Sequence, residues 1–112
     1  MVVSHDDTLG RMCGHQYKEN RVSDFDYADM PKYQNKVSMH MTQGEYNLRD
    51  DEDGRMPLLR ELFEAFPNTL ISIDIKEKDE ILVQKVNDMI VEFSRENKTV
   101  WGSMFKEQHL IA

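Results

Sequence analysis

Apolar positions recur with helical spacing in two stretches of the second half of the chain. The first stripe follows Pro57 and consists of Leu58, Leu59, Leu62, Phe63 and Phe66. The second follows Asp79 and consists of Leu82, Val86, Met89, Ile90 and Phe93. The spacing predicts helices over about 57–66 and 80–96. Pro57 suits a first helical turn, and Asp79 is a typical N-cap.

Residues between and after these stripes are typical of β-strands. Residues 70–76 read Leu-Ile-Ser-Ile-Asp-Ile-Lys, and residues 99–102 read Thr-Val-Trp-Gly. Val2-Val3 resembles the end of a further strand. Residues 7–34 are predicted to be mostly loop, and the polar, acidic residues 35–54 an exposed loop.

Strands and helices alternate along the chain, which predicts an α/β fold with a parallel sheet and crossover helices. Three strands make a small sheet with two open edges. One face would lack cover, because a parallel sheet normally has both faces buried. The pattern therefore indicates a slice of a larger α/β fold. Open edges and an uncovered face with Ile71, Ile73 and Ile75 would favour self-association.

Composition narrows the classes of partner. The 112 residues are enough for one domain or part of one. The formal net charge is −7, so nucleic acid is not an expected partner. The apolar runs are too short for a transmembrane helix. A single cysteine, Cys13, excludes an intrachain disulfide.

The strand at 70–76 carries the most informative polar pattern. Side chains alternate along a strand, so Ser72, Asp74 and Lys76 share the face opposite the isoleucines. In a barrel, such residues near the carboxyl end of a strand line a polar active-site mouth. A partly solvated Asp–Lys pair without catalytic meaning explains the pattern equally well.

His5-Asp6 directly follows the Val2-Val3 segment. Histidine is the usual general acid or base near neutral pH, and the adjacent carboxylate could orient it. If Val2-Val3 ends a parallel strand, His5 should converge with Asp74 and Lys76 at one edge of the sheet. Cys13 and His15 have no second ligand pair, so a zinc site is not expected there.

Five segments resemble, in order, the glycerophosphodiester phosphodiesterase family, and specifically its animal lysophospholipase D-type branch. They are Val2-Val3-Ser4-His5-Asp6-Asp7-Thr8-Leu9-Gly10-Arg11, Arg55-Met56-Pro57-Leu58-Leu59, Phe63-Glu64-Ala65-Phe66-Pro67-Asn68-Thr69, Ile73-Asp74-Ile75-Lys76 and Thr99-Val100-Trp101-Gly102. The resemblance covers almost the whole chain and is weakest at 36–54 and 105–112.

This resemblance implies a (β/α)8 TIM barrel of the phosphatidylinositol-phosphodiesterase-like type, of which residues 1–112 would form about three of eight units. His5 matches the family's general acid or base. Asp74 matches a metal-binding carboxylate, and Lys76 a phosphate-contacting lysine. The implied cofactor is Mg²⁺ or Ca²⁺. Most relatives outside this branch have Glu where Asp74 stands. The family's earlier histidine, arginine and two metal carboxylates have no counterpart in this chain, which suggests a truncated product.

The resemblance implies a metal-dependent hydrolase of lysophospholipids or glycerophosphodiesters, in the cytoplasm or at the endoplasmic reticulum membrane. Membrane attachment would depend on parts absent from this chain. With one metal carboxylate, the isolated chain is expected to be inactive. The alternative is a non-catalytic product that binds or regulates a partner. A third, weaker interpretation takes His5-Asp6 as the mark of a helical metal phosphohydrolase.

Overall fold

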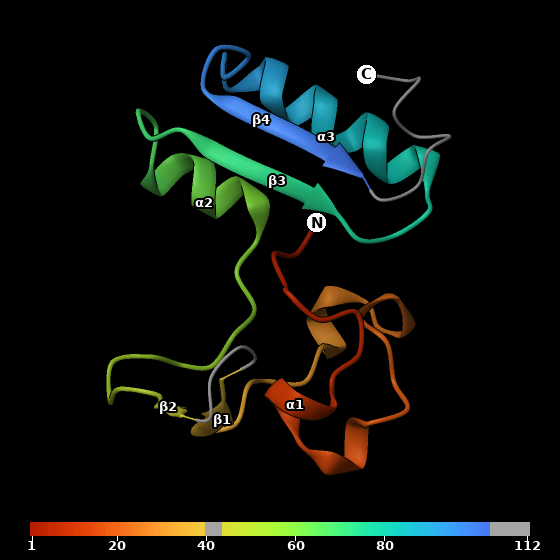
Figure 1. The fold of residues 1–112 in the computed structure, drawn as a ribbon, viewed down its shortest axis with the longest axis vertical. Coiled ribbons are helices and arrows are strands. Elements are labelled where there is room, and N and C mark those ends of the chain that lie inside the picture. Colours follow the sequence, from red (N-terminus) through yellow and green to blue (C-terminus); the bar gives the residue numbers. More distant parts are fainter. Residues whose placement is uncertain (40–43, 104–112) are drawn as a thin grey trace. The chain divides into compact units, whose positions relative to one another are not determined.

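Two compact units make up the chain, which a computed structural model describes over residues 1–39 and 44–103 (Figure 1). One unit is Val2–Pro57. The other consists of Met1 together with Leu58–Ala112. Each unit has its own core of buried apolar side chains.

The unit that begins at Leu58 is a small α/β structure. In order it contains α2 (Leu59–Ala65), β3 (Ile71–Ile75), α3 (Glu80–Glu92) and β4 (Thr99–Ser103). β3 and β4 pair in parallel, with Ile71 opposite Thr99 and Ile75 opposite Ser103. The predicted elements and the parallel pairing are confirmed, although both helices are shorter than predicted. The Asp79 side chain caps α3 by accepting hydrogen bonds from the backbone N–H groups of Ile81 and Leu82.

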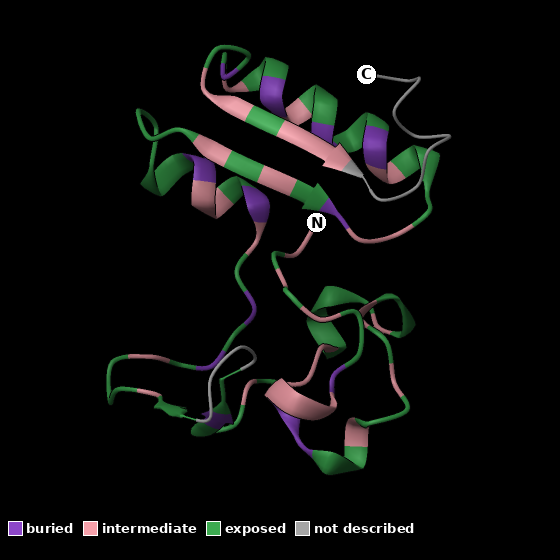
Figure 2. Cartoon of the chain, viewed as in Figure 1, coloured by how far each residue is buried: buried purple, intermediate pink, exposed green. Residues whose placement is uncertain are grey.

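Both helices pack on the isoleucine face of the sheet. The buried cluster consists of Leu59, Phe63, Ile75, Val83, Val86 and Ile90. Ile71 and Ile73 pack against this cluster, whereas Ser72 and Asp74 are exposed, so burial alternates along β3 (Figure 2). The expectation that the isoleucines would be uncovered is therefore wrong. The two helices bring their apolar stripes to the same face, which leaves the polar face of β3 exposed.

A buried arginine, Arg95, connects several segments of this unit through its side-chain contacts. Arg95 is only 1% exposed. Its guanidinium donates to the carbonyls of Phe66 (2.8 Å) and Thr69, and it stacks 4.7 Å from the ring centroid of Phe63. The Arg95 side chain thus supplies a donor to the Phe66 carbonyl at the end of α2, where a helix lacks internal partners, and another to Thr69 in the following loop. It also connects the segment before β4 with the segment before β3.

Arg95 reaches the core because of the turn that ends α3. Ser94 has a left-handed backbone (φ 52°), and its N–H donates to the carbonyl of Val91. The Arg95 N–H donates to the carbonyl of Ile90. This is a Schellman turn, which satisfies the last carbonyls of a helix and reverses the chain.

The Val2–Pro57 unit consists of short elements. These are α1 (Gly10–Cys13), the 3-10 turns His15–Tyr17, Val22–Asp24 and Tyr27–Asp29, and the strands β1 (Lys36–Ser38) and β2 (Glu45–Asn47). Its core contains Leu9, Cys13 and Met56. The irregular character predicted for residues 7–34 is confirmed.

Two features of this unit differ from the sequence-based expectation. The structure assigns no strand to Val2-Val3, although the Val3 N–H donates to the carbonyl of Pro57 at 2.8 Å. Within the predicted loop at 35–54, β1 and β2 pair antiparallel, with Ser38 opposite Glu45. Two three-residue strands lie below the length at which alternation of apolar and polar residues is recognisable.

Among the residues that the structure describes, no helix is long and apolar enough to cross a bilayer.

Replacing Arg95 is predicted to destabilise the α/β unit strongly. Arg95→Met should lower the free energy of unfolding by about 3 kcal/mol, because two partly buried hydrogen bonds from a charged donor to backbone carbonyls are lost. Urea unfolding followed by circular dichroism measures the change. Arg60→Met is the matched control: Arg60 also stacks on a phenylalanine, Phe93, but it is exposed and paired with Glu92. A similar loss in both variants would contradict the role assigned to Arg95.

Candidate functional site

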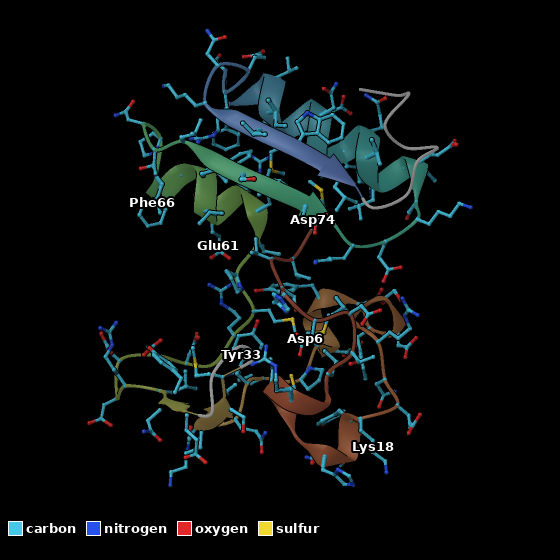
Figure 3. All side chains as sticks on the ribbon, viewed as in Figure 1. Asp6, Lys18, Tyr33, Glu61, Phe66 and Asp74 are labelled. Carbon is cyan, nitrogen blue, oxygen red and sulfur yellow. The ribbon has the colours of Figure 1, made fainter. Side chains whose placement is uncertain are left out.

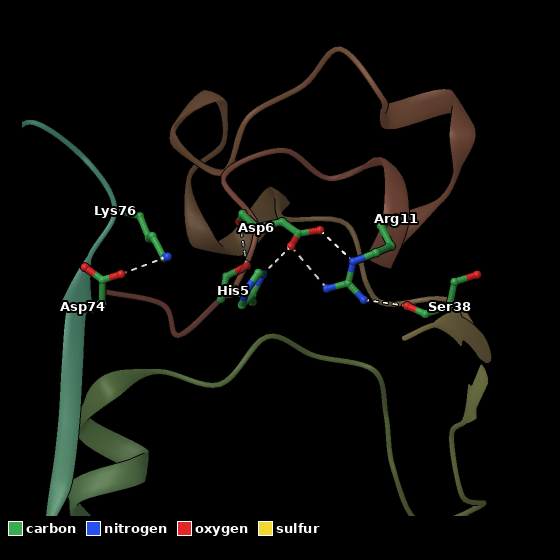
Figure 4. A network of polar contacts seen from close by, with 7 residues as sticks. His5, Asp6, Arg11, Ser38, Asp74 and Lys76 are labelled. Carbon is green, nitrogen blue, oxygen red and sulfur yellow. Dashed lines mark hydrogen bonds and ion pairs between the residues drawn. The ribbon is translucent and has the colours of Figure 1, made fainter. Parts of the chain in front are cut away.

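The carboxyl end of β3 presents a carboxylate and an ammonium group side by side. Asp74 lies on the exposed face of β3, and Lys76 follows the last residue of the strand. Figure 3 shows Asp74 on β3, and the Lys76 Nζ donates to Asp74 Oδ2 at 2.9 Å (Figure 4). Alternation along the strand places both side chains on the same face, as the sequence predicted.

Solvent reaches both members of this pair. The Asp74 side chain is 59% exposed and that of Lys76 is 38% exposed. An exposed ion pair of this kind contributes little to folding stability. The arrangement therefore puts two opposite charges at a strand end without a strong structural need for either of them.

His5 forms a second polar centre, in the Val2–Pro57 unit. The contact between His5 Nδ1 and Asp6 Oδ1 is 2.7 Å (Figure 4). An ionised carboxylate can only accept, so Nδ1 carries the proton in this contact. In the neutral ring, Nε2 then carries the lone pair. The His5 side chain is 59% exposed, which suits exchange of a proton with a reacting group.

Asp6 is held more firmly than His5. Its side chain is 16% exposed and receives two hydrogen bonds from Arg11, from Nε to Oδ2 at 2.8 Å and from Nη2 to Oδ1 at 3.3 Å. Arg11 Nη1 also donates to the carbonyl of Ser38 in β1 at 2.6 Å. The hydrogen bond from Arg11 lowers the pKa of Asp6, the contact with His5 lowers it further, and burial opposes both.

The described residues do not by themselves fit a divalent cation. They contain no group of three or more His, Cys, Asp or Glu side chains placed to hold a metal ion. Asp74 is a single carboxylate, and one of its oxygens accepts from Lys76. Because Mg²⁺ and Ca²⁺ bind through several oxygen ligands, Asp74 can be at most one ligand of such a site.

The structure brings together some of the predicted residues. Asp74 and Lys76 are in contact, and Asp6 contacts His5. His5 belongs to the other unit, so its convergence with Asp74 and Lys76 stays a prediction. Sequence reasoning included Arg11 in a motif but gave it no role. A basic residue five positions after an acidic one is a weak sequence signal for an ion pair. The path of the folded loop is what brings the Arg11 and Asp6 side chains into contact.

Comparisons with known proteins agree on one family. The sequence profile of the Glycerophosphoryl diester phosphodiesterase family matches residues 1–111. The chain is 40% identical over 103 residues to human Lysophospholipase D GDPD1, an alignment that covers 92% of this chain and 31% of the relative. The rat protein of that name is 40% identical over 107 residues, covering 96% of this chain and 32% of the relative. The chain is also 33% identical over 103 residues to human Lysophospholipase D GDPD3. That alignment covers 92% of this chain and 31% of the relative.

The chain therefore spans about a third of the length of these curated relatives. No solved structure shows a significant match to the chain.

Asp6 is predicted to titrate below the usual range of an aspartate. Arg11→Gln should raise the pKa of Asp6, because the largest cause of its lowering is removed. A lowered pKa in the folded state stabilises the fold above the unfolded-state pKa, and this stabilisation is lost as the pH falls through the folded-state value. Carbon-13 NMR of the side-chain carboxyl measures both titrations.

The matched control for this titration is Arg21→Gln. Arg21 forms a half-exposed ion pair with Asp7, at 3.2 Å, in the same loop. This variant should leave the pKa of Asp6 nearly unchanged. An ordinary Asp6 titration in the unaltered chain would show that the contact with Arg11 does not persist in solution.

Proposed function

The chain belongs to the glycerophosphoryl diester phosphodiesterase family, and we propose that it supplies part of a site that hydrolyses the phosphodiester bond of lysophospholipids. The observation that carries this proposal is the contact between His5 and Asp6 in a family-matched segment, because it gives a solvent-exposed histidine a fixed carboxylate partner. The relatives' name, lysophospholipase D, indicates cleavage on the headgroup side of the phosphate.

In this proposal, His5 transfers a proton. Water attacks phosphorus and the headgroup alcohol leaves, so one group must take a proton from the water and one must give a proton to the departing oxygen. With Nδ1 donating to Asp6, proton exchange takes place at Nε2. Asp6 also stabilises the imidazolium that forms when Nε2 is protonated, because its carboxylate is ionised at neutral pH.

Lys76 is proposed to face the phosphate. A positive charge next to the phosphoryl oxygens stabilises the negative charge that builds up on them in the transition state. Asp74 is proposed as one carboxylate ligand of a divalent cation, with the remaining ligands outside the described residues. Without the cation, the pairing of Asp74 with Lys76 keeps both charged groups near the strand end.

We further infer that β3 and β4 are neighbouring strands of a (β/α)8 barrel. Three observations support this. The strands are parallel and consecutive in the chain. Both helices pack on one face of the sheet. On the opposite face, Ser72 and Asp74 are exposed to solvent. In such a barrel, helices cover the outside, and functional residues gather at the carboxyl ends of the strands.

A chimeric enzyme tests the role of His5. In human Lysophospholipase D GDPD1, this chain replaces the matched 103-residue segment, and release of choline from lysophosphatidylcholine is measured. His5→Ala should lower turnover by about 10²–10⁴-fold, the usual effect of removing a general acid or base.

His15→Ala is the control in the same chimera, since His15 is also an exposed histidine of this unit. It should leave turnover unchanged. Activity near that of the unaltered chimera in His5→Ala would exclude the proton-transfer role. A folded but inactive unaltered chimera would contradict the proposed function itself.

The 112-residue chain alone is predicted to release choline no faster than the buffer blank, with or without Mg²⁺. The reason is that its described residues offer no cluster of three metal ligands, and Mg²⁺ gives up its hydration water reluctantly. The assay is the same choline measurement on the purified chain. Choline release that depends on Mg²⁺ and is lost in Asp74→Asn would show that a complete site exists in this chain.

A further inference from the structure

We propose that Arg11 is a positioning residue: its guanidinium fixes Asp6 and, through Asp6, the tautomer and orientation of His5. This inference rests on the proposed function, because it assigns a purpose to the orientation of His5. The contacts that support it lie within the Val2–Pro57 unit and do not depend on any ligand.

The geometry of Arg11 is that of an anchor with three attachments. Its Nε and Nη2 donate to the two carboxylate oxygens of Asp6, at 2.8 and 3.3 Å, and its Nη1 donates to the carbonyl of Ser38 at 2.6 Å (Figure 4). Ser38 ends β1, and Arg11 lies in α1, so the guanidinium is fixed between two elements. A planar guanidinium that bonds on both edges cannot rotate without losing one of these contacts.

Fixing Asp6 matters because His5 itself is exposed. An imidazole in water can carry its proton on either nitrogen and can rotate about its side-chain bonds. Here, Asp6 Oδ1 accepts hydrogen bonds both from His5 Nδ1 and from Arg11 Nη2. The carboxylate is ionised at any pH at which the ring is neutral, and the contact with Arg11 lowers its pKa further, so it can only accept from the ring. Arg11 thereby acts on the tautomer of His5 through Asp6.

The amide variant of Asp6 gives a sharp prediction. Arg11 can only donate, so Asp6→Asn can keep only one of its two contacts with the side chain, and the shorter one, from Nε at 2.8 Å rather than from Nη2 at 3.3 Å, favours the amide oxygen at the Oδ2 position. The amide nitrogen then occupies the Oδ1 position and donates to His5 Nδ1. The ring must then accept at Nδ1 and carry its proton on Nε2, the opposite of the unaltered chain.

Nitrogen-15 NMR of the His5 ring in the full 112-residue chain tests the proposal, at a pH where the ring is neutral. The unaltered chain should show mainly the Nδ1–H form, and Asp6→Asn mainly the Nε2–H form. The double variant Asp6→Asn/Arg11→Gln should show a mixture, because nothing then orients the amide. Arg11→Gln alone should lose part of the Nδ1–H population, and Arg11→Lys should restore some of it.

Arg21→Gln is the control, because Arg21 lies in the same unit and pairs with Asp7. It should leave the His5 tautomer unchanged. The proposal is overturned if folded Arg11→Gln keeps the tautomer of the unaltered chain, or if Asp6→Asn and the double variant give the same spectrum. Asp6→Asn retains Arg11 and therefore remains informative if Arg11→Gln fails to fold.

Turnover in the chimeric enzyme gives an independent measure. Arg11→Gln should lower kcat about 10–100-fold, the usual effect of losing a partner that orients a functional histidine, with KM unchanged. The tautomer measurement needs no turnover, so failure of the proposed function would leave it standing. Conversely, an active chimera in which Arg11→Gln retains full kcat would overturn the role of Arg11 alone.

Discussion

Successive side chains of β3 point to opposite faces of the sheet, and the α/β unit depends on this alternation. Ile71, Ile73 and Ile75 face the helices, whereas Ser72 and Asp74 are exposed. The helices therefore cover the face that carries no charge, and Asp74 keeps its contact with water and with Lys76. A shift of one residue in the strand would bury Asp74 and expose the isoleucines, at a large desolvation cost.

The residues that stabilise the α/β unit and the residues of the candidate site lie at opposite ends of β3 and β4. Arg95 precedes β4 and binds carbonyls of Phe66 and Thr69, which precede β3, so its contacts join the amino ends of the two strands. Asp74 and Lys76 lie at the carboxyl end of β3. This division is expected of parallel β/α structures, in which one end can hold the fold while the other is free to vary in function.

The Val2–Pro57 unit has little regular structure, so side-chain contacts rather than long helices or strands hold its segments together. Its short turns are connected by side chains, and Asp6 is the clearest example. The Asp6 carboxylate accepts from His5 and from two nitrogens of the Arg11 guanidinium, whose third nitrogen donates to the carbonyl of Ser38. Asp6 thereby connects His5 and Arg11 through a charge-assisted contact that is only partly removed from water.

The sequence by itself determined that helices follow Pro57 and Asp79, that strands lie at about 70–76 and 99–102 in a parallel sheet, and that Asp74 and Lys76 share a face, because these features follow from periodicity and element order. Its motifs also predicted membership of the glycerophosphodiester phosphodiesterase family, which the comparisons confirm. Only the tertiary structure decided that the isoleucine face is covered, that Arg95 is buried and that Arg11 holds Asp6. The physical reason is that each of these depends on contacts between residues far apart in the chain or on the path of an irregular loop, which no local pattern specifies.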